Sequence, residues 1–249
     1  MPTDFVLGVD VGYSNVKYAY GKVGSSGLST SIRPAYAIRG KRDEMGISKH
    51  NGELEVLVGE GYWRVFDPKA RVDRELHSHY HRTDAYTALL YGSLYETYGE
   101  HNGSIDTLVT GLPVSIAKDP AESKWLRNRL TGRHEISKGV FVDVKRSFVI
   151  PQGVGIINQM ANDCEQISDD LLEEGIILVA DPGYFSFDYV LYDAGERVEQ
   201  QSGSTLHAVS VLIEQIQSLV HQDYRRAPPS STLPARFWPE IGTLGMRIQ

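Results

Sequence analysis

The chain has 249 residues, 41% of them hydrophobic, so it can bury one large core or two cores of ordinary size. Its formal net charge of −7 at pH 7 argues against general affinity for nucleic acid or an anionic membrane, because both depend on basic patches. The single cysteine, Cys164, excludes an internal disulfide framework and is expected to be an inert thiol. The start, MPTDF, lacks a basic region, and no stretch reaches the roughly 20 apolar residues of a membrane helix. We therefore expect a cytoplasmic protein.

The chain begins with a segment that predicts a β-hairpin. In residues 5–21, FVLGVDVGYSNVKYAYG, two β-rich runs are separated by a Gly-Tyr turn. The following residues, about 25–82, are polar and turn-rich, with strands expected near residues 31–37 and 54–58. We expect this stretch to form a small inserted subdomain.

Two helices are predicted next. Thr83 or Asp84 can cap the first, which has an apolar face and should pack on a sheet. That face consists of Tyr86, Leu89, Leu90 and Leu94. The second helix is capped by Asp119, with Pro120 at its first position and Glu122 closing a capping box.

Strands are expected at residues 107–111 and 140–150. The PQG sequence at 151–153 breaks the second of them before a short helix over residues 154–161. With these elements, a first domain is predicted to span residues 1–172.

A second domain is predicted for residues 173–249. The apolar run IILVA is followed by DPG and then by an alternating segment at residues 187–192, which repeats the organisation of the N-terminus. An amphipathic helix ending near His221 should follow, and residues 225–249 are proline-rich and expected to be irregular. The apolar residues at helical spacing are Leu206, Val209, Ile213, Ile216 and Val220.

Two segments share one pattern, and this repeat is the strongest signal in the chain. In VLGVDVGYSNVKY and ILVADPGYFSFDY, Asp10 or Asp181 lies where a strand meets a tight turn, two residues before Gly12 or Gly183. A glycine there lets backbone amides approach a ligand closely, which suits phosphate oxygens. One such turn often makes an ordinary hairpin, but two copies in matching context favour a binding site.

Polar side chains follow both turns. Ser14, Asn15 and Lys17 add hydroxyl, amide and ammonium donors after the first turn, and Ser186 adds a hydroxyl after the second. One triphosphate could then be held from both sides. Lys17 could also be a solvated residue at a strand edge.

The two aspartates are candidates for the metal side of this site. Asp10 and Asp181 would not repel a phosphate if a hydrated magnesium ion lay between them and the anion. Magnesium keeps most of its waters and binds through one or two carboxylates plus phosphates.

Five motifs occur in an order that resembles a known superfamily. They are VDVGYSNVK near the start, GLPVS at 111–115, PQGVG at 151–155, DPGYFSFD at 181–188 and SGSTLHAVS at 202–210. The chain resembles the actin superfamily, and within it the ParM/StbA-type plasmid-segregation proteins, including the actin-like protein D of PRTRC plasmid systems. The resemblance implies an α/β, actin-like (ribonuclease H-like duplicated) fold with two domains flanking a nucleotide cleft.

The resemblance also implies roles for individual residues. Asp10 helps to hold the water shell of the magnesium ion that accompanies ATP or GTP. Gln152 matches the position that orients the attacking water, which Asp181 could also polarise. The residues implied to contact the nucleotide are Asp10, Gly12, Tyr13, Ser14, Asn15 and Lys17 in the first loop, and Gly183, Tyr184, Phe185 and Ser186 in the second.

The function that follows is an ATPase that forms filaments for plasmid segregation. An acidic filament is expected to reach DNA through a DNA-binding adaptor protein, without direct nucleic-acid or membrane contact. Relatives continue through a glycine-rich turn that covers the adenosine, and no such turn follows residues 202–210, so we expect the second domain to be incomplete and the chain to be C-terminally truncated.

Two other functions stay open. A small-molecule kinase could use the same duplicated fold. A nucleotide-binding interaction protein without turnover is favoured by Tyr184 and Phe185, which replace a glycine and a small residue of many relatives.

Three histidines, His77, His79 and His81, alternate in RELHSHYHR. On an extended strand they would share one face, as metal ligands commonly do. Because charged residues surround them and no cysteine lies nearby, we favour a solvated loop.

Overall fold

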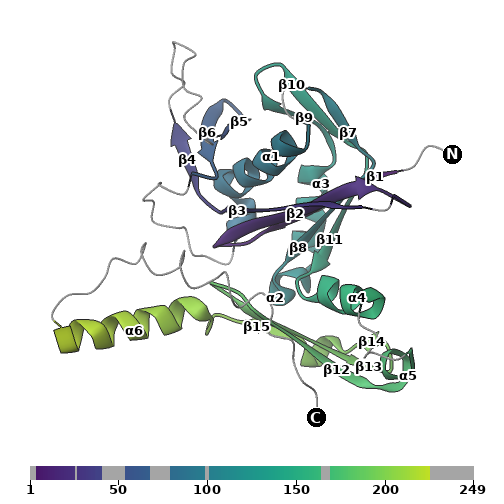
Figure 1. The fold of residues 1–249 in the computed structure, drawn as a ribbon, viewed down its shortest axis with the longest axis vertical. Coiled ribbons are helices and arrows are strands. Elements are labelled where there is room, and N and C mark those ends of the chain that lie inside the picture. Colours follow the sequence, from purple (N-terminus) through teal and green to yellow (C-terminus); the bar gives the residue numbers. More distant parts are fainter. Residues whose placement is uncertain are drawn as a thin grey trace.

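The structure is a computed structural model that describes residues 4–25, 27–40, 54–67, 79–98, 101–163 and 169–224. Figure 1 shows an N-terminal body, which carries β1 to β11, and a C-terminal sheet built from β12 to β15, with α2 and α4 between them. Several sequence predictions concern residues outside the described ranges: His77, Cys164 and the irregular tail at 225–249. Among the helices of the described ranges, none has the length and apolar character needed to cross a membrane.

The N-terminal body is built on a five-stranded sheet in the order β11-β8-β1-β2-β3. The strands are β1 (Phe5–Val11), β2 (Asn15–Lys22), β3 (Ser29–Pro34), β8 (Thr107–Leu112) and β11 (Ser147–Pro151). The predicted hairpin is confirmed, because β1 and β2 pair antiparallel. On the other side of β1, β8 pairs with it in parallel, and β11 pairs in parallel with β8. Alternation in β1 buries Leu7, Val9 and Val11 on one side of the sheet.

Two three-stranded sheets complete this body in the described residues. Their orders are β4-β6-β5 and β7-β10-β9. The strands are β4 (Ala37–Gly40), β5 (Leu54–Val58), β6 (Gly61–Val65), β7 (Gly103–Ile105), β9 (Gly132–Ser137) and β10 (Val140–Val144). The segment expected as an inserted subdomain is thus divided, since β3 extends the five-stranded sheet while β4, β5 and β6 form a sheet of their own.

The single strand predicted over residues 140–150 is wrong, because the chain there forms β10 and β11 in different sheets. The break falls at Lys145 and Arg146, two adjacent exposed residues. Lys145 pairs with Asp106 at 2.6 Å and Arg146 with Asp4 at 3.0 Å. Two successive charged side chains that both face water cannot continue the alternation of a half-buried strand, so the chain bends.

The helices that come before α5 in the described chain are η1 (Tyr80–Arg82), α1 (Asp84–Tyr98), α2 (Val114–Ala117), α3 (Pro120–Leu130) and α4 (Val154–Asp163). The predicted caps are confirmed: Thr83 Oγ1 accepts from the Tyr86 amide at 3.1 Å, and Asp119 Oδ1 accepts from the Ala121 amide at 2.8 Å. The predicted capping box is wrong. The Glu122 carboxylate turns away from the Asp119 amide, which donates to the backbone of Ile116 instead.

The C-terminal part repeats the hairpin. Its elements are α5 (Asp169–Glu174), β12 (Ile176–Pro182), β13 (Phe187–Asp193), β14 (Glu196–Arg197), η2 (Glu199–Gln201), β15 (Gly203–Thr205) and α6 (Val209–Tyr224). β12 and β13 pair antiparallel, which confirms the second predicted hairpin. The expected helical position of Leu206 is wrong, because β15 pairs with β13 up to Thr205 and the helix begins only after a turn.

Two clusters of buried apolar residues support these parts. The larger joins residues of the central sheet, α1, α3 and both smaller sheets of the N-terminal body. The smaller consists of Val114, Ile157, Val179 and Val190, and so lies between α2, α4 and the second hairpin. The second hairpin therefore packs on α2 and α4 through Val179 and Val190, in the middle of its two strands.

Candidate nucleotide site

All of the residues predicted to act on or bind a nucleotide line one cavity. This cavity has a volume of about 540 Å³ and lies between the turn of the β1–β2 hairpin and the turn of the β12–β13 hairpin. The predicted residues on its wall are Asp10, Gly12, Tyr13, Ser14, Asn15, Lys17, Gln152, Asp181, Gly183, Tyr184, Phe185 and Ser186. Two turns that are far apart in the sequence thus face one space.

The first turn is tight because it contains a glycine. The Gly12 amide donates to the Asn15 carbonyl oxygen at 3.0 Å, and a Cβ on Gly12 would lie 2.9 Å from that same oxygen, too close for any side chain. Next to the turn, Asp10 lies opposite Lys17, with Lys17 Nζ 4.0 Å from Asp10 Oδ2. The Lys17 side chain is 61% exposed, so its ammonium group can reach an anion at the mouth of the cavity.

The second turn uses the same backbone device. A Cβ on Gly183 would lie 2.6 Å from the Ser186 carbonyl oxygen, three residues on, as in the first turn. Ser186 Oγ donates to Asp188 Oδ2 at 2.7 Å, and the Ser210 amide at the start of α6 donates to the Tyr184 carbonyl oxygen at 2.9 Å. The repeat seen in the sequence is therefore a repeat in backbone geometry.

Three carboxylates gather around the cavity. Asp10, Asp181 and Asp188 all line it. Burial raises the pKa of Asp181 above its ordinary value, and the charge of Asp10 raises it further. Burial also raises the pKa of Asp10, against the opposing charge of Lys17, although 43% of the Asp10 side chain can still reach water in the cavity. This excess of negative charge favours a cation.

These residues fit a nucleotide with magnesium. Gly12 and Gly183 line the cavity without a side chain, so the backbone of both turns can approach a ligand there. Asp10 and Asp181 supply the hard oxygen atoms that magnesium prefers, and one or two carboxylates are the usual protein share of its shell.

Gln152 is held between the first hairpin and β8. Its side-chain Nε2 donates to Asp10 Oδ1 at 3.1 Å, and its backbone N–H donates to the Leu112 carbonyl oxygen at 2.8 Å. A Cβ on Gly111 would lie 3.0 Å from Gln152 Cγ, so the glycine leaves room for this side chain. With its amide nitrogen engaged, Gln152 keeps its carbonyl oxygen for another partner.

Asp188 is a site residue that sequence reasoning missed. It is 3% exposed and accepts hydrogen bonds from the Val114 amide at 2.7 Å, from Ser186 Oγ, and from Ser204 Oγ. It thereby ties the second turn to the N-terminal end of α2. The alternation of β13 could have found it, because Asp188 lies on the same face of the strand as buried Val190.

Further hydrogen bonds join α2 to β15. The Ser115 amide donates to Ser204 Oγ at 2.9 Å, and the Ser204 amide donates to Ser115 Oγ at 2.9 Å. Lys118 Nζ donates to the Ser202 carbonyl oxygen at 2.6 Å. These polar contacts add to the small apolar cluster in positioning the second hairpin.

Aromatic rings connect the two turns directly. The Tyr13 ring stacks on Tyr80 with centroids 4.7 Å apart, and it contacts the Phe185 ring at 4.5 Å. Burial, and then the charge of Asp188, raise the pKa of Tyr13, so this side chain stays neutral. The rings of Tyr13 and Phe185 therefore close part of the space between the two turns.

The solvated loop expected for the histidines is wrong for His81. This residue is 3% exposed, and its Nε2 lies 2.7 Å from Glu122 Oε2. Local sequence suggested solvation, because the partner carboxylate is far away in the chain. His79 is exposed, as expected.

The comparisons with known proteins agree with this geometry. The family model described as "Actin like proteins N terminal domain" matches residues 8–155. The chain belongs to this family of actin-like proteins, and its fold is actin-like. No curated protein matches the chain.

Solved structures with this fold include plasmid and archaeal proteins. The archaeal actin homologue Ta0583 has a TM-score of 0.68 at 20% identity, over 90% of this chain and 69% of that one; its complex with ADP has a TM-score of 0.64 at 19% identity, over 90% and 68%. The apo psk41 ParM protein has a TM-score of 0.61 at 15% identity, over 88% and 71%. AlfA from the B. subtilis plasmid pLS32, in a filament, has a TM-score of 0.61 at 13% identity, over 88% and 78%.

Proposed function

We propose that this chain is a magnesium-dependent nucleotide-binding protein that hydrolyses ATP or GTP and forms filaments for plasmid segregation, of the ParM/StbA type and related to protein D of PRTRC systems. The observation that carries the proposal is the single cavity that both glycine turns line. Two unrelated surface hairpins would not be expected to line one cavity. Nor would they be expected to share a turn in which the backbone carbonyl oxygen three residues on lies close against the glycine.

The cavity residues have two roles in this proposal, phosphate binding and magnesium binding. The backbone of the two turns, with Ser14, Asn15 and Lys17, holds the phosphates, while Asp10 and Asp181 hold the water shell of magnesium. When bound, that ion neutralises charge on the phosphate oxygens.

Hydrolysis of a phosphoanhydride depends on placing a water in line and stabilising spread charge. The Gln152 carbonyl oxygen can accept from such a water, because its Nε2 is already fixed on Asp10. Asp181 gives a second acceptor on the opposite wall.

Self-association follows from the family and from solved filaments with the same fold. The similar structures include AlfA filaments, one of them bound to AMPPNP, and an Alp12 filament. A head-to-tail contact that does not close produces such a fibre. With a net charge of −7, this filament would contact plasmid DNA through a basic adaptor protein.

A second function, nucleotide binding without turnover, is favoured by one observation. Tyr13 and Phe185 are in contact between the turns, where they occupy space that a triphosphate would share. If these rings stay in place, a ligand could bind while the attacking water is excluded.

One experiment separates the two. The purified full chain is mixed with magnesium and ATP or GTP, and light scattering is followed together with phosphate release. A rise in both signals supports the filament ATPase. Scattering or nucleotide binding without phosphate release supports the second function, and silence in both signals with no nucleotide binding contradicts both.

A further inference from the structure

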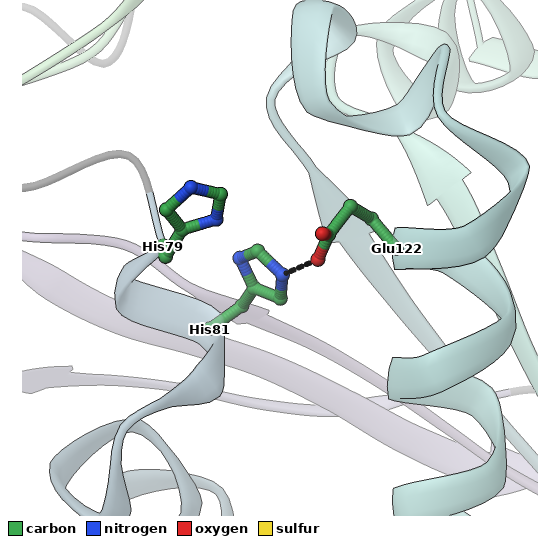
Figure 2. Close-up of side chains that lie close together, drawn as sticks. All are labelled: His79, His81 and Glu122. Carbon is green, nitrogen blue, oxygen red and sulfur yellow. Dashed lines mark hydrogen bonds and ion pairs between the residues drawn. The ribbon is translucent and has the colours of Figure 1, made fainter.

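A second cluster of titratable side chains lies beside the cavity, and one of its members, His81, is part of the cavity wall. Figure 2 shows His79, His81 and Glu122, which come from the region of η1 and from the first turn of α3. One ligand atom of each residue lies within 4.8 Å of the others. We propose that these three residues form a binding site for a divalent transition metal of the zinc class.

Local structure explains why these side chains converge. His79 immediately precedes the 3-10 turn η1, and His81 lies within it. Both imidazoles therefore extend from one short, tightly wound segment. The cap by Asp119 and the proline at the first position start α3 so that Glu122 lies in its first turn. Its carboxylate points from there toward the two rings.

The surroundings suit a metal ligand set. His81 is buried and packs edge-on against Trp125 at 6.1 Å. Burial lowers the pKa of His81, against the opposing effect of Glu122, which favours the neutral imidazole that metals require. Two histidines and one glutamate are a known zinc set that leaves the fourth position for water.

Arg82 supplies the outer contact that such sites commonly have. Its Nη2 donates to Glu122 Oε1 at 2.8 Å, and its Nε donates to Oε2 at 2.8 Å. The guanidinium group also lies 4.7 Å over the Trp125 ring. Arg82 can keep its bond to Oε1 and orient the carboxylate, while Oε2 turns from Arg82 and His81 to the ion.

The movement required is small. Ligand atoms on a tetrahedral zinc ion, at about 2.1 Å from the metal, are roughly 3.4 Å apart. His79 is exposed, so its ring can close the difference from 4.8 Å by rotating its side chain. The hydrogen bonds among His81, Arg82 and Glu122 stabilise η1 without any ion, so a need for His79 distinguishes a metal site from an ion-pair cluster.

A metal at this place would stiffen the cavity wall. Tyr80 lies between the two histidines in the chain and stacks on Tyr13 of the first turn. Both Tyr80 and His81 line the cavity. A bound metal would therefore link η1 to α3 next to the cavity wall, and this link does not depend on a nucleotide in the cavity.

The test uses the full chain after removal of metal by a chelator. Zinc binding is measured by calorimetry, and cobalt is used as a spectroscopic probe of coordination. We expect one zinc per chain and a higher thermal midpoint with zinc. His79→Ala and Glu122→Gln should each weaken zinc binding by more than about 100-fold, because even the outer partners of metal ligands are worth roughly 10- to 100-fold.

Two controls keep the proposal open to refutation. His101→Ala removes an exposed histidine outside the cluster and should bind zinc like the unaltered chain. The thermal midpoint of His79→Ala is first measured without metal, and a midpoint close to that of the unaltered chain shows that the loss of zinc binding does not come from unfolding. The proposal is overturned if the chain binds no zinc, if His79→Ala binds it normally, or if His77→Ala abolishes binding while His79→Ala and Glu122→Gln retain it.

Discussion

The two hairpins that face the cavity have the same turn geometry but different support. The β1–β2 hairpin lies in a five-stranded sheet, and its Val16 is fully buried in the large apolar cluster of the N-terminal body. The β12–β13 hairpin buries Val179 and Val190 in a cluster that it shares with Val114 and Ile157 of that body. The second turn is therefore positioned by contacts of its hairpin with α2 and α4.

Both regions also expose large apolar side chains on their outer surfaces. On β12, Ile176 is 71% exposed and Leu178 is 58% exposed, whereas the alternate residue Val179 is buried. Along α6, Leu212, Ile216 and Leu219 are spaced as one helical stripe and are also more than half exposed. In the first region, Ile32 on β3 and Phe148 on β11 are also more than half exposed. Within the described residues, the second region differs in its core, which has only four buried apolar residues, two of them from the hairpin itself. We therefore expect the second hairpin to open without unfolding of the N-terminal body.

The largest effect is expected from the carboxylates, where the two turns are proposed to act on one ligand. Asp10→Ala and Asp181→Ala should each reduce magnesium-dependent phosphate release by about 100-fold or more, because each removes a charge aimed at the reacting group. Phosphate release is measured at saturating magnesium ATP or GTP. Asp193→Ala, an exposed aspartate at the other end of the second hairpin, is the matched control and should be silent. Unchanged turnover in both variants would remove these residues from the site.

The next largest effect is expected from truncating the buried apolar residues that hold each hairpin in place. Val16→Ala and Val190→Ala truncate the same side chain at two positions that are both 0% exposed. Each should cost about 2 kcal/mol locally. By hydrogen exchange, Val16→Ala should lower protection throughout the N-terminal body, and Val190→Ala only in β12 and β13. Equal loss in β1 and β8 for both variants would show that the two regions unfold as one unit.

The two hairpins were predictable from the sequence, because each depends on apolar and polar residues that alternate within a short segment and on a glycine turn inside it. Residues 5–21 and 176–192 give the strand period and the glycine that the turn requires, and the structure confirms both hairpins. That the two turns meet at one cavity followed from the resemblance to a duplicated fold. No periodicity in either segment specifies a partner so distant in the chain.

The side-chain interactions that the sequence did not predict involve partners far away in the chain. Asp188 looked like one more polar residue of a strand, and its role appears only with the Val114 amide, 74 positions earlier. Glu122 fits a local capping box, yet the tertiary contact with His81 and Arg82 wins, because a charge-assisted bidentate pair is stronger than one bond to a backbone amide. Local patterns therefore predicted elements well and polar networks poorly.

A smaller effect is expected at the polar link between the regions. Asp188→Asn keeps the shape of the side chain but removes its negative charge and replaces one acceptor oxygen with a donor. At least one of the three groups that donate to Asp188, the Val114 amide, Ser186 Oγ and Ser204 Oγ, must then lose its bond or reverse it. We expect a cost of about 1–2 kcal/mol in the free energy of unfolding, measured by urea denaturation. Protection of the Val114 amide from exchange should fall as well. Asp193→Asn, which is exposed, provides the control, and equal stability of the two variants would contradict the link.

The smallest effect tests whether the outer face of the second region is open. Leu178→Thr changes a side chain that is 58% exposed and keeps strand propensity, so the free energy of unfolding should change by less than about 0.5 kcal/mol. Val179→Thr, one residue on and 5% exposed, places a hydroxyl in the small cluster and should cost more, about 1–2 kcal/mol. Both are measured by urea denaturation at several protein concentrations. If Leu178→Thr destabilises the chain as strongly as Val179→Thr, the outer face is covered in solution. A cost that grows with protein concentration would identify that cover as a second copy, because only association depends on concentration.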